Sequence, residues 1–265
     1  MPNIRPLCLI TGASSGIGAD LAHCAAAGGF DLVLVARRVS ALAQLAERCE
    51  RMHNVRAISI PADLADPTAC RVLGAELRAR KLDVHTLINN AGVGASGTVS
   101  TLTVEVQMNI IQVNVTALTE LTRRLLPGML ERGSGAVMNV ASTAAFLPGP
   151  GMAVYYASKA YVLSFTEALA EELRDTGIQV SALCPGPTHT EFAAVAGMST
   201  SKLFKQRGLA MSSAAVARAG WEGLLSGQRI VIPGLRNRLL IQSLRAAPRA
   251  LAARISASLN ASSAP

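Results

Sequence analysis

Short apolar runs alternate with longer segments of helical spacing along most of the chain. Seven of the short runs are apolar without in-and-out alternation, which is typical of strands covered on both faces. The predicted strands are Leu7–Thr11, Phe30–Ala36, Val55–Ile60, Val84–Asn89, Gly135–Ser142, Ile178–Cys184 and Arg229–Ile232. Between them the spacing predicts helices near residues 16–27, 40–52, 66–80, 103–126, 152–175 and 190–225.

The order of these elements indicates the fold class. Strand and helix in turn predict βαβ units and a parallel sheet. Right-handed crossovers then place helices on both faces of that sheet. Because no Pro/Gly/Ser-rich linker divides the chain, we expect residues 1–265 to form a single α/β domain with a doubly wound parallel sheet of about seven strands.

Composition narrows the class of protein. Half of the 265 residues are hydrophobic and 16% are charged, which excludes a disordered chain and allows a large core. The five cysteines are scattered and the four histidines lack ligand spacing, so we expect neither a disulfide framework nor a metal site. Scattered, unpaired thiols are typical of the cytoplasm, which is the compartment that we expect.

The sequence also argues against several other classes. No uncharged apolar stretch reaches 18 residues, and the first apolar run is too short for a signal-peptide core, so we expect no membrane span and no secretion signal. The net charge of +8 allows acidic partners. Aromatic residues are few and no nucleic-acid-binding module is recognised, so we expect no nucleic-acid partner.

A glycine-rich loop follows the first predicted strand and precedes a predicted helix. It reads Thr11-Gly12-Ala13-Ser14-Ser15-Gly16-Ile17-Gly18. Glycines let a backbone approach a pyrophosphate closely, and a helix N-terminus supplies free N–H groups and the positive end of its dipole. In a first βαβ unit this arrangement indicates a dinucleotide-binding loop, and the alternative is an ordinary glycine-rich turn.

The spacing G-x-x-x-G-x-G resembles the compact short-chain dehydrogenase/reductase family, a Rossmann-type group of nicotinamide enzymes. Further segments support the resemblance in the order expected: Asp63-Leu64, Asn89-Asn90-Ala91-Gly92, Ser142, Tyr155-x-x-x-Lys159 and the stretch Cys184–Thr190. Together they cover residues 11–190. Taken singly, Y-x-x-x-K is a weak signal, and its position among the others makes it specific.

The resemblance implies a set of cofactor contacts. The loop residues Gly12, Ser14, Ser15, Gly16, Ile17 and Gly18 would bind the phosphates, and Asp63 and Leu64 would contact the adenine. Asn89, Ala91 and Gly92 would line the cofactor, with Tyr155 and Lys159 at the nicotinamide ribose. Pro185, Gly186, Thr188 and Thr190 would also bind the cofactor, with the Thr188 backbone and the Thr190 hydroxyl at the nicotinamide carboxamide.

The end of the second strand predicts which dinucleotide is bound. An acidic residue there would hydrogen-bond the ribose hydroxyls of NAD(H), but Ala36 takes that position and Arg37 and Arg38 follow. A guanidinium pairs well with a phosphate. We therefore expect NADP(H) rather than NAD(H), with Arg37 on the 2′-phosphate and Ser14 or Arg38 assisting. The alternative for at least one arginine is a solvated charge at the strand end.

A tyrosine and a lysine one helical turn apart form the candidate acid–base pair. Tyr155 and Lys159 share a helix face because they are four residues apart, whereas Tyr156 lies about 100° round the helix. A free phenol has a pKa of about 10. A nearby ammonium and the positive oxidised nicotinamide would favour the phenolate and lower that pKa. Tyr155 could then exchange a proton with a carbonyl or alcohol oxygen.

Ser142 and Asn114 complete the catalytic set that the resemblance implies. Ser142, at the end of the fifth predicted strand, would hold the substrate oxygen beside Tyr155. Asn114 lies in the helix after the Asn-Asn-Ala-Gly loop, where the family carries an asparagine linked through water to the lysine. Ser158 and Asn109 are the competing residues. Ser158 fits neither the strand end nor the family position, and the flanking Val-Asn-Val-Thr-Ala pattern favours Asn114.

Residues 190–226 correspond to the segment that covers the substrate in relatives. Its apolar side chains suit a hydrophobic ketone or alcohol, although packing on the sheet would account for most of them. They are Phe192, Val195, Met198, Leu203, Phe204, Leu209, Met211 and Trp221. The sequence thus predicts an NADP(H)-dependent oxidoreductase that interconverts a ketone or aldehyde and an alcohol by hydride transfer. The alternative is an NADP(H)-binding regulatory or membrane-peripheral protein with little turnover.

Two further patterns concern partners. Residues 236–260 predict a basic helical extension broken at Pro248, because arginines alternate with leucines and no Asp or Glu follows Glu222. This extension is either packed on the domain with solvated arginines or in contact with anionic lipid. The predicted helix at 152–175 is apolar on two sides. One side would contact the sheet and the other a second subunit, as in a homodimer or homotetramer.

Overall fold

The computed structural model describes residues 5–198, 210–246 and 248–260, in which seven strands form one parallel sheet. The strand order is β3-β2-β1-β4-β5-β6-β9, and every neighbouring pair runs parallel. The strands are β1 Leu7–Thr11, β2 Asp31–Ala36, β3 Ala57–Pro61, β4 Val84–Asn89, β5 Gly135–Val140, β6 Ile178–Leu183 and β9 Ile230–Val231. Each corresponds to one predicted apolar run, so the doubly wound α/β sheet is confirmed.

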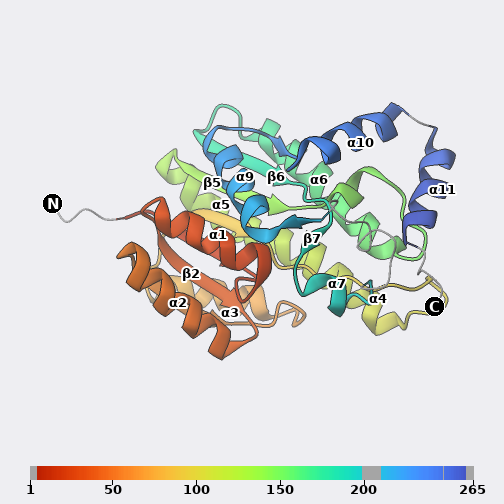
Figure 1. Ribbon diagram of the computed structural model, residues 1–265. Helices are drawn as coiled ribbons and strands as arrows, with labels where there is room; N and C mark the ends of the chain where they lie inside the picture. Colours follow the sequence, from red (N-terminus) through yellow and green to blue (C-terminus); the bar gives the residue numbers. More distant parts are fainter. Residues whose placement is uncertain (1–4, 199–209, 247, 261–265) are drawn as a thin grey trace.

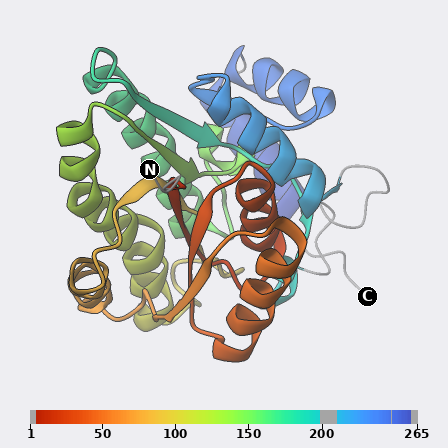
Figure 2. The ribbon, with the colours of Figure 1, turned by 90° about the vertical axis from the view of Figure 1, so that its left-hand side faces the viewer.

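Helices cover both faces of this sheet, and Figure 2 shows the strands between two helical layers. On one face, Ile10 and Leu34 pack with α1 (Gly16–Ala27), α2 (Val39–His53) and α9 (Ser213–Leu225). On the other, Leu9 and Val33 pack with α3 (Ala69–Ala79), α5 (Leu118–Arg132) and α6 (Ala153–Glu172). Adjacent residues of one strand face different helical layers, which is why these strands are apolar without alternation.

The winding of the chain reverses between β1 and β4, which are neighbours in the centre of the sheet. In parallel sheets of this kind, the crevice outside the carboxyl ends of the strands at the reversal is where ligands bind. The glycine-rich loop follows β1 and the Asn-Asn-Ala-Gly loop follows β4, so both lie at this crevice. The topology therefore places the predicted cofactor loops together.

Two predicted helices are divided in the structure. The one expected at 103–126 consists of α4 (Val104–Ile111), a π-helical turn over Gln112–Ala117, and α5. The one expected near 190–225 is wrong, because its described parts are α7 (Phe192–Val195), the strand β8 (Met211–Ser212) and α9. β8 pairs with β7 (Thr188–His189), and Ser212 Oγ accepts the Ala215 N–H as the N-cap of α9. Strand pairing and capping outweigh the helical spacing here.

Two further helices follow β9, namely α10 (Leu235–Ala246) and α11 (Arg249–Asn260), with the predicted break at Pro248. Figure 1 shows them at the end of the molecule that also holds α4 and α7. Ile241, Leu244 and Ala252 are buried, so both helices pack on the rest of the chain. Leu235 and Leu239 remain exposed. Within the described ranges, no helix combines the length and apolar character that a membrane crossing requires.

Candidate active site

The glycine-rich loop connects β1 to α1 and keeps its backbone close to neighbouring atoms. Gly16 has a φ of 55°, which L side chains rarely adopt. A Cβ at Gly18 would lie 2.4 Å from the Gly12 carbonyl oxygen, so a side chain does not fit there. Ser15 is the N-cap of α1 but makes no side-chain capping bond, which leaves the first N–H groups available for an anion. These features fit a dinucleotide pyrophosphate.

The side chains of the two asparagines at the end of β4 point to different places. Asn90 Nδ2 donates to the Thr11 carbonyl oxygen at 2.9 Å and so holds the glycine-rich loop against β4. Asn89 is buried and donates to Thr122 Oγ1 at 3.0 Å and Asn139 Oδ1 at 2.9 Å. The Asn89 side chain therefore stabilises the core. We had expected it to line the crevice. Asn90 is the positioning residue that the sequence interpretation missed.

The rest of this loop contacts both the glycine-rich loop and Lys159. The Ala91 N–H donates to Thr11 Oγ1 at 3.0 Å, which continues the contact between the two loops. Gly92 lies against the end of Lys159, since a Cβ there would be 3.2 Å from Lys159 Nζ. On the other side of the crevice, Ile17 is half-buried and packs with the α1 side of the core.

At the end of β2, the structure brings Arg38 rather than Arg37 to the glycine-rich loop. Arg38 Nε and Nη2 donate to Ser14 Oγ at 3.2 and 3.1 Å. The same guanidinium forms an ion pair with Glu191 at 2.9 Å. Arg37 is exposed beside it. We expected Arg38 only to assist Arg37. In the structure, Arg38 is the arginine whose guanidinium lies beside the glycine-rich loop.

The segments after β3 and β6 supply the remaining predicted cofactor residues. Asp63 is exposed after β3 and accepts the Ala65 N–H at 3.1 Å, while Leu64 is buried. After β6, the Pro185 carbonyl oxygen accepts the Thr143 N–H at 2.8 Å.

Thr188 and Thr190 follow in the same segment after β6. Thr188 Oγ1 donates to the Gly186 carbonyl oxygen at 2.9 Å, which holds the turn between Pro185 and β7. Thr190 lies over the glycine-rich loop, because a Cβ at Gly16 would be 2.9 Å from the methyl carbon of Thr190. The segment after β6 therefore reaches across to the loop after β1.

Tyr155 and Lys159 lie one turn apart on α6, near Ser142. Lys159 Nζ is 5.9 Å from the centroid of the Tyr155 ring and donates to the Val140 carbonyl oxygen at 2.8 Å. Ser142 Oγ accepts the Ala144 N–H at 3.1 Å and so begins a short 3₁₀ turn over Thr143–Phe146. The sequence predicted that Ser142 would end the fifth strand. Because of this turn, it instead lies two residues beyond the end of β5.

Burial is the largest influence on the pKa values of Tyr155 and Lys159. It raises the pKa of the Tyr155 phenol, while a hydrogen bond with Ser142 acts in the opposite direction. Burial also lowers the pKa of Lys159 to about 8. The Tyr155 pKa is thus raised, whereas we had expected the ammonium to lower it, because desolvation disfavours the charged form of each group. A neutral phenol is the form that can donate a proton.

Asn114 is buried in the π-helical turn between α4 and α5. Its Oδ1 accepts the Val93 N–H at 2.8 Å, and its Nδ2 donates to the Val93 carbonyl oxygen and to Ser158 Oγ, both at 2.9 Å. Ser158 Oγ in turn donates to the Tyr155 carbonyl oxygen at 2.7 Å. Ser158 therefore links Asn114 to the helix that carries Tyr155, a connection that its place in the sequence does not indicate.

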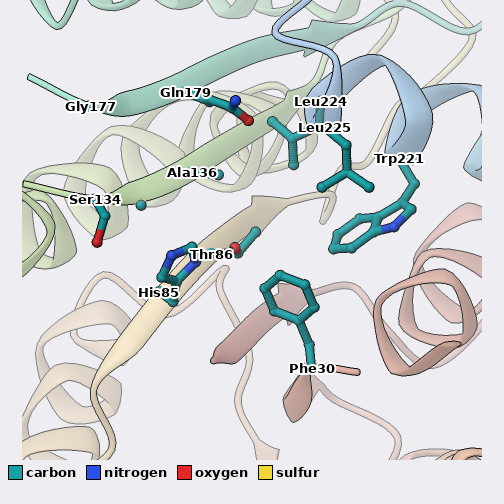
Figure 3. Close-up of a pocket in the computed structure, with 11 residues that line it drawn as sticks. Phe30, His85, Thr86, Ser134, Ala136, Gly177, Gln179, Trp221, Leu224 and Leu225 are labelled. Atoms are coloured by element: carbon teal, nitrogen blue, oxygen red, sulfur yellow. Dashed lines mark hydrogen bonds between the residues drawn. The ribbon is translucent and has the colours of Figure 1, made fainter. Parts of the chain in front are cut away.

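A separate cavity of about 220 Å³ lies at the amino ends of β4, β5 and β6, on the opposite edge of the sheet (Figure 3). There the rings of Phe30 and Trp221 meet edge to face, with centroids 5.3 Å apart. We expected Trp221 to help cover the substrate. Its position at the amino ends of the strands shows that this expectation was wrong. α9 packs on α1 and carries Trp221 to the far edge. Leu203, Phe204 and Leu209 lie outside the described residues.

Comparisons with known proteins agree with this geometry. Residues 6–199 match the family described as short chain dehydrogenase. The chain is 36% identical over 203 residues to ketoacyl reductase HetN of Nostoc sp.. The aligned residues cover 73% of this chain and 70% of that protein. A short-chain dehydrogenase from Sphingobium yanoikuyae in complex with NADPH superposes with a TM-score of 0.82 at 36% identity, covering 93% of this chain and 94% of that chain.

A second solved structure is similar over most of its length. The bulky-bulky ketone specific alcohol dehydrogenase from Comamonas testosteroni has a TM-score of 0.77 at 31% identity, covering 90% of this chain and 91% of that chain. The parallel sheet with its glycine-rich loop defines a Rossmann-type α/β protein. The chain belongs to the short-chain dehydrogenase family of oxidoreductases, as the motifs predicted.

Proposed function

We propose that the chain interconverts a ketone or aldehyde and an alcohol, with NADP(H) as the hydride carrier and Ser142, Tyr155, Lys159 and Asn114 as its site. The observation that carries the proposal is the position of the Tyr155–Lys159 pair. Tyr155 lies beside Ser142, and Lys159 lies against Gly92 at the carboxyl edge of the sheet. That edge also carries the glycine-rich loop, so acid and cofactor would meet at one crevice.

Each residue has a distinct part in the proposed reduction. A bound reduced nicotinamide supplies the hydride. Tyr155 Oη donates its proton to the carbonyl oxygen, and Ser142 Oγ donates a hydrogen bond that polarises the same oxygen. Lys159, whose pKa burial lowers to about 8, holds a proton near the phenol that can replace the one transferred. Asn114 fixes the turn and helix around them through Val93 and Ser158.

Three features support NADP(H) over NAD(H). Ala36 cannot accept hydrogen bonds from ribose hydroxyls, whereas Arg38 and Ser14 form a cationic donor pair at the loop. The Sphingobium neighbour holds NADPH, which agrees with the same choice.

A hydrophobic substrate is supported by the side chains around Tyr155. The Phe192 ring lies 5.3 Å from the Tyr155 ring, centroid to centroid. Met152, Met198 and Ala196 form a buried apolar cluster with the neighbouring Tyr156. We therefore propose that the described part of residues 190–226 near Tyr155 covers the substrate, and that its pocket accepts an apolar ketone. The ketone named for the Comamonas neighbour is consistent with such a pocket.

The proposed function is tested by following NADPH oxidation with a panel of aliphatic, aromatic and steroid ketones. We expect turnover with at least one apolar ketone and a slower reaction with NADH. NADPH binding without turnover on any ketone or aldehyde would instead favour the regulatory alternative. Pelleting of the protein with anionic vesicles in that case would favour the membrane-peripheral one.

We also propose that the protein forms a homodimer or homotetramer. Val104, Met108 and Ile111 on α4 are exposed, and Tyr161 on α6 is 40% exposed beside Phe165. Covering such side chains with a second copy would remove apolar surface from water. Light scattering coupled to size-exclusion chromatography would measure the mass, and a monomer at micromolar concentration would contradict the proposal.

A further inference from the structure

The segment from Thr188 to Val195 crosses from the substrate side of the crevice to the glycine-rich loop. Phe192 in this segment packs on Tyr155, and Thr190 lies over Gly16. Between these two contacts, Glu191 reaches the loop on the other side of the crevice. The position of this carboxylate matters because the loop is where the cofactor phosphates are expected.

Glu191 is held by Ser15 and Arg38, which are both expected to bind phosphate groups of the cofactor. Ser15 Oγ donates to Glu191 Oε2 at 3.0 Å. Arg38 Nη1 donates to Oε1 at 3.2 Å, and Arg38 Nη2 lies 2.9 Å from Oε2. The remaining Arg38 contacts go to Ser14. The guanidinium is thus shared between one carboxylate and one hydroxyl, and Ser15 is withdrawn from capping α1.

The charge on Glu191 is stabilised by these contacts. Hydrogen bonds from Arg38 and Ser15, together with the Arg38 charge, lower the pKa of the Glu191 carboxyl, so it is ionised at neutral pH. A carboxylate that already neutralises Arg38 reduces the attraction of that guanidinium for a second anion. The 2′-phosphate of NADP(H) carries such a charge near this end of the cofactor, and NAD(H) lacks it.

We propose that Glu191 sets the selectivity between NADPH and NADH by competing with the 2′-phosphate for Arg38. The inference rests on the proposed function and deepens it, because it assigns a second acidic partner to the cofactor-selecting arginine. NADPH must displace the carboxylate from Arg38 on binding. NADH has no 2′-phosphate, so its binding can leave the ion pair between Glu191 and Arg38 intact.

The test is equilibrium binding of NADPH and of NADH, followed by cofactor fluorescence, to the full chain and to Glu191→Gln. The glutamine retains the size of the side chain and an oxygen that can accept from Ser15, but it removes the charge. We expect NADPH to bind at least threefold more tightly and NADH to change less than twofold, a modest gain because Glu191 and Arg38 are both partly exposed. Glu131→Gln, on the exposed surface of α5, is the charge-matched control and should change neither.

A double-mutant cycle separates competition from general repulsion. In an Arg38→Ala background, Glu191→Gln should no longer improve NADPH binding, because the guanidinium for which the two anions compete is absent. An undiminished gain would show that the carboxylate repels the phosphate directly and would overturn the proposal. Unchanged or weaker NADPH binding by the single variant Glu191→Gln would overturn it as well.

The outcomes also distinguish this inference from the proposed function. If the unmodified protein binds neither dinucleotide, the proposed function fails and the role of Glu191 fails with it. If the unmodified protein binds NADPH and Glu191→Gln does not strengthen that binding, only the role of Glu191 fails. Circular dichroism should show unchanged folding for both glutamine variants, since each replaces an exposed carboxylate.

Discussion

Tyr156 Oη donates a hydrogen bond to Asn260 Oδ1 at 2.9 Å, which ties the last described residue of α11 to the residue after Tyr155. Asn260 Nδ2 donates in turn to the Pro150 carbonyl oxygen at 3.1 Å. Both Tyr156 and Asn260 are buried. Asn260 therefore bridges the C-terminal helix, the loop before α6 and the start of the helix that carries Tyr155.

Replacement of this asparagine should loosen α11. Asn260→Ala leaves the buried Tyr156 hydroxyl without its partner, which costs about 1–3 kcal/mol. Because α11 is the last helix, we expect local opening, seen as at least fivefold faster hydrogen exchange of its amides. Ser243→Ala on the exposed surface of α10 is the control and should not change that exchange. Equal protection of α11 in both variants would contradict the bridging role.

Tyr155→Phe should abolish most turnover while leaving NADPH binding intact. The variant keeps the ring and its packing on Phe192 but removes the proton donor, for which a loss of about 100-fold or more in kcat is typical. Tyr161→Phe is a matched control, because Tyr161 lies on the same helix and bonds Thr119 away from the site. Full activity of Tyr155→Phe would exclude Tyr155 as the proton donor.

The two arginines after β2 should differ in their effect on cofactor choice. Hydrogen bonds to charged groups contribute about 1.5–3 kcal/mol, so Arg38→Ala should weaken NADPH binding by about tenfold or more. It should weaken NADH binding much less. Arg37→Ala should have the smaller effect on NADPH, because the structure places Arg38 at Ser14. Titration of all four combinations measures this, and a larger NADPH loss in Arg37→Ala would restore the sequence-based assignment.

The buried ammonium of Lys159 should make stability depend on pH. Its pKa is lowered from an ordinary 10.5 to about 8, so between these values the unfolded chain holds a proton that the folded protein has released. Stability from this group therefore rises with pH across that window, and the charge is a cost below about pH 8. Each pKa unit corresponds to about 1.4 kcal/mol.

Lys159→Met removes this dependence. The unfolding free energy of the variant relative to the unmodified protein should therefore fall by about 2–3 kcal/mol between pH 7 and 10. Urea unfolding at the two pH values provides the measurement. Lys81→Met at an exposed position is the control. A relative stability that stays constant with pH would show that Lys159 titrates near its ordinary value.

The buried amide network beneath the site should contribute to stability and not to cofactor choice. Asn139 accepts from Asn89 Nδ2 and donates to Thr166 Oγ1, each at 2.9 Å. Asn139→Ala leaves polar groups of both neighbours without a partner and should lower the free energy of unfolding by about 2–4 kcal/mol. The NADPH/NADH preference should be unchanged. Denaturant unfolding and cofactor titration test the two statements separately, and a changed preference would place Asn139 in the cofactor site.

Much of the fold followed from patterns that are local in the sequence. The seven apolar runs correspond to seven strands because a strand buried on both faces must be apolar throughout. Tyr155 and Lys159 could be paired because a helix fixes the geometry of residues four apart. The glycine-rich loop could be recognised because its backbone conformation requires glycine at particular positions, such as Gly12 and Gly16.

What the sequence could not determine are contacts between distant segments. Whether Asn89 or Asn90 faces the crevice depends on where β4 ends, since successive strand residues point to opposite faces. Trp221 was assigned to the substrate side because it lies within residues 190–226, yet packing of its helix on α1 carries it to the far edge. The meeting of Glu191 with Ser15 and Arg38 joins three separate loops. Local spacing determined the elements and their motifs, and only the packing of those elements decided which side chains share one crevice.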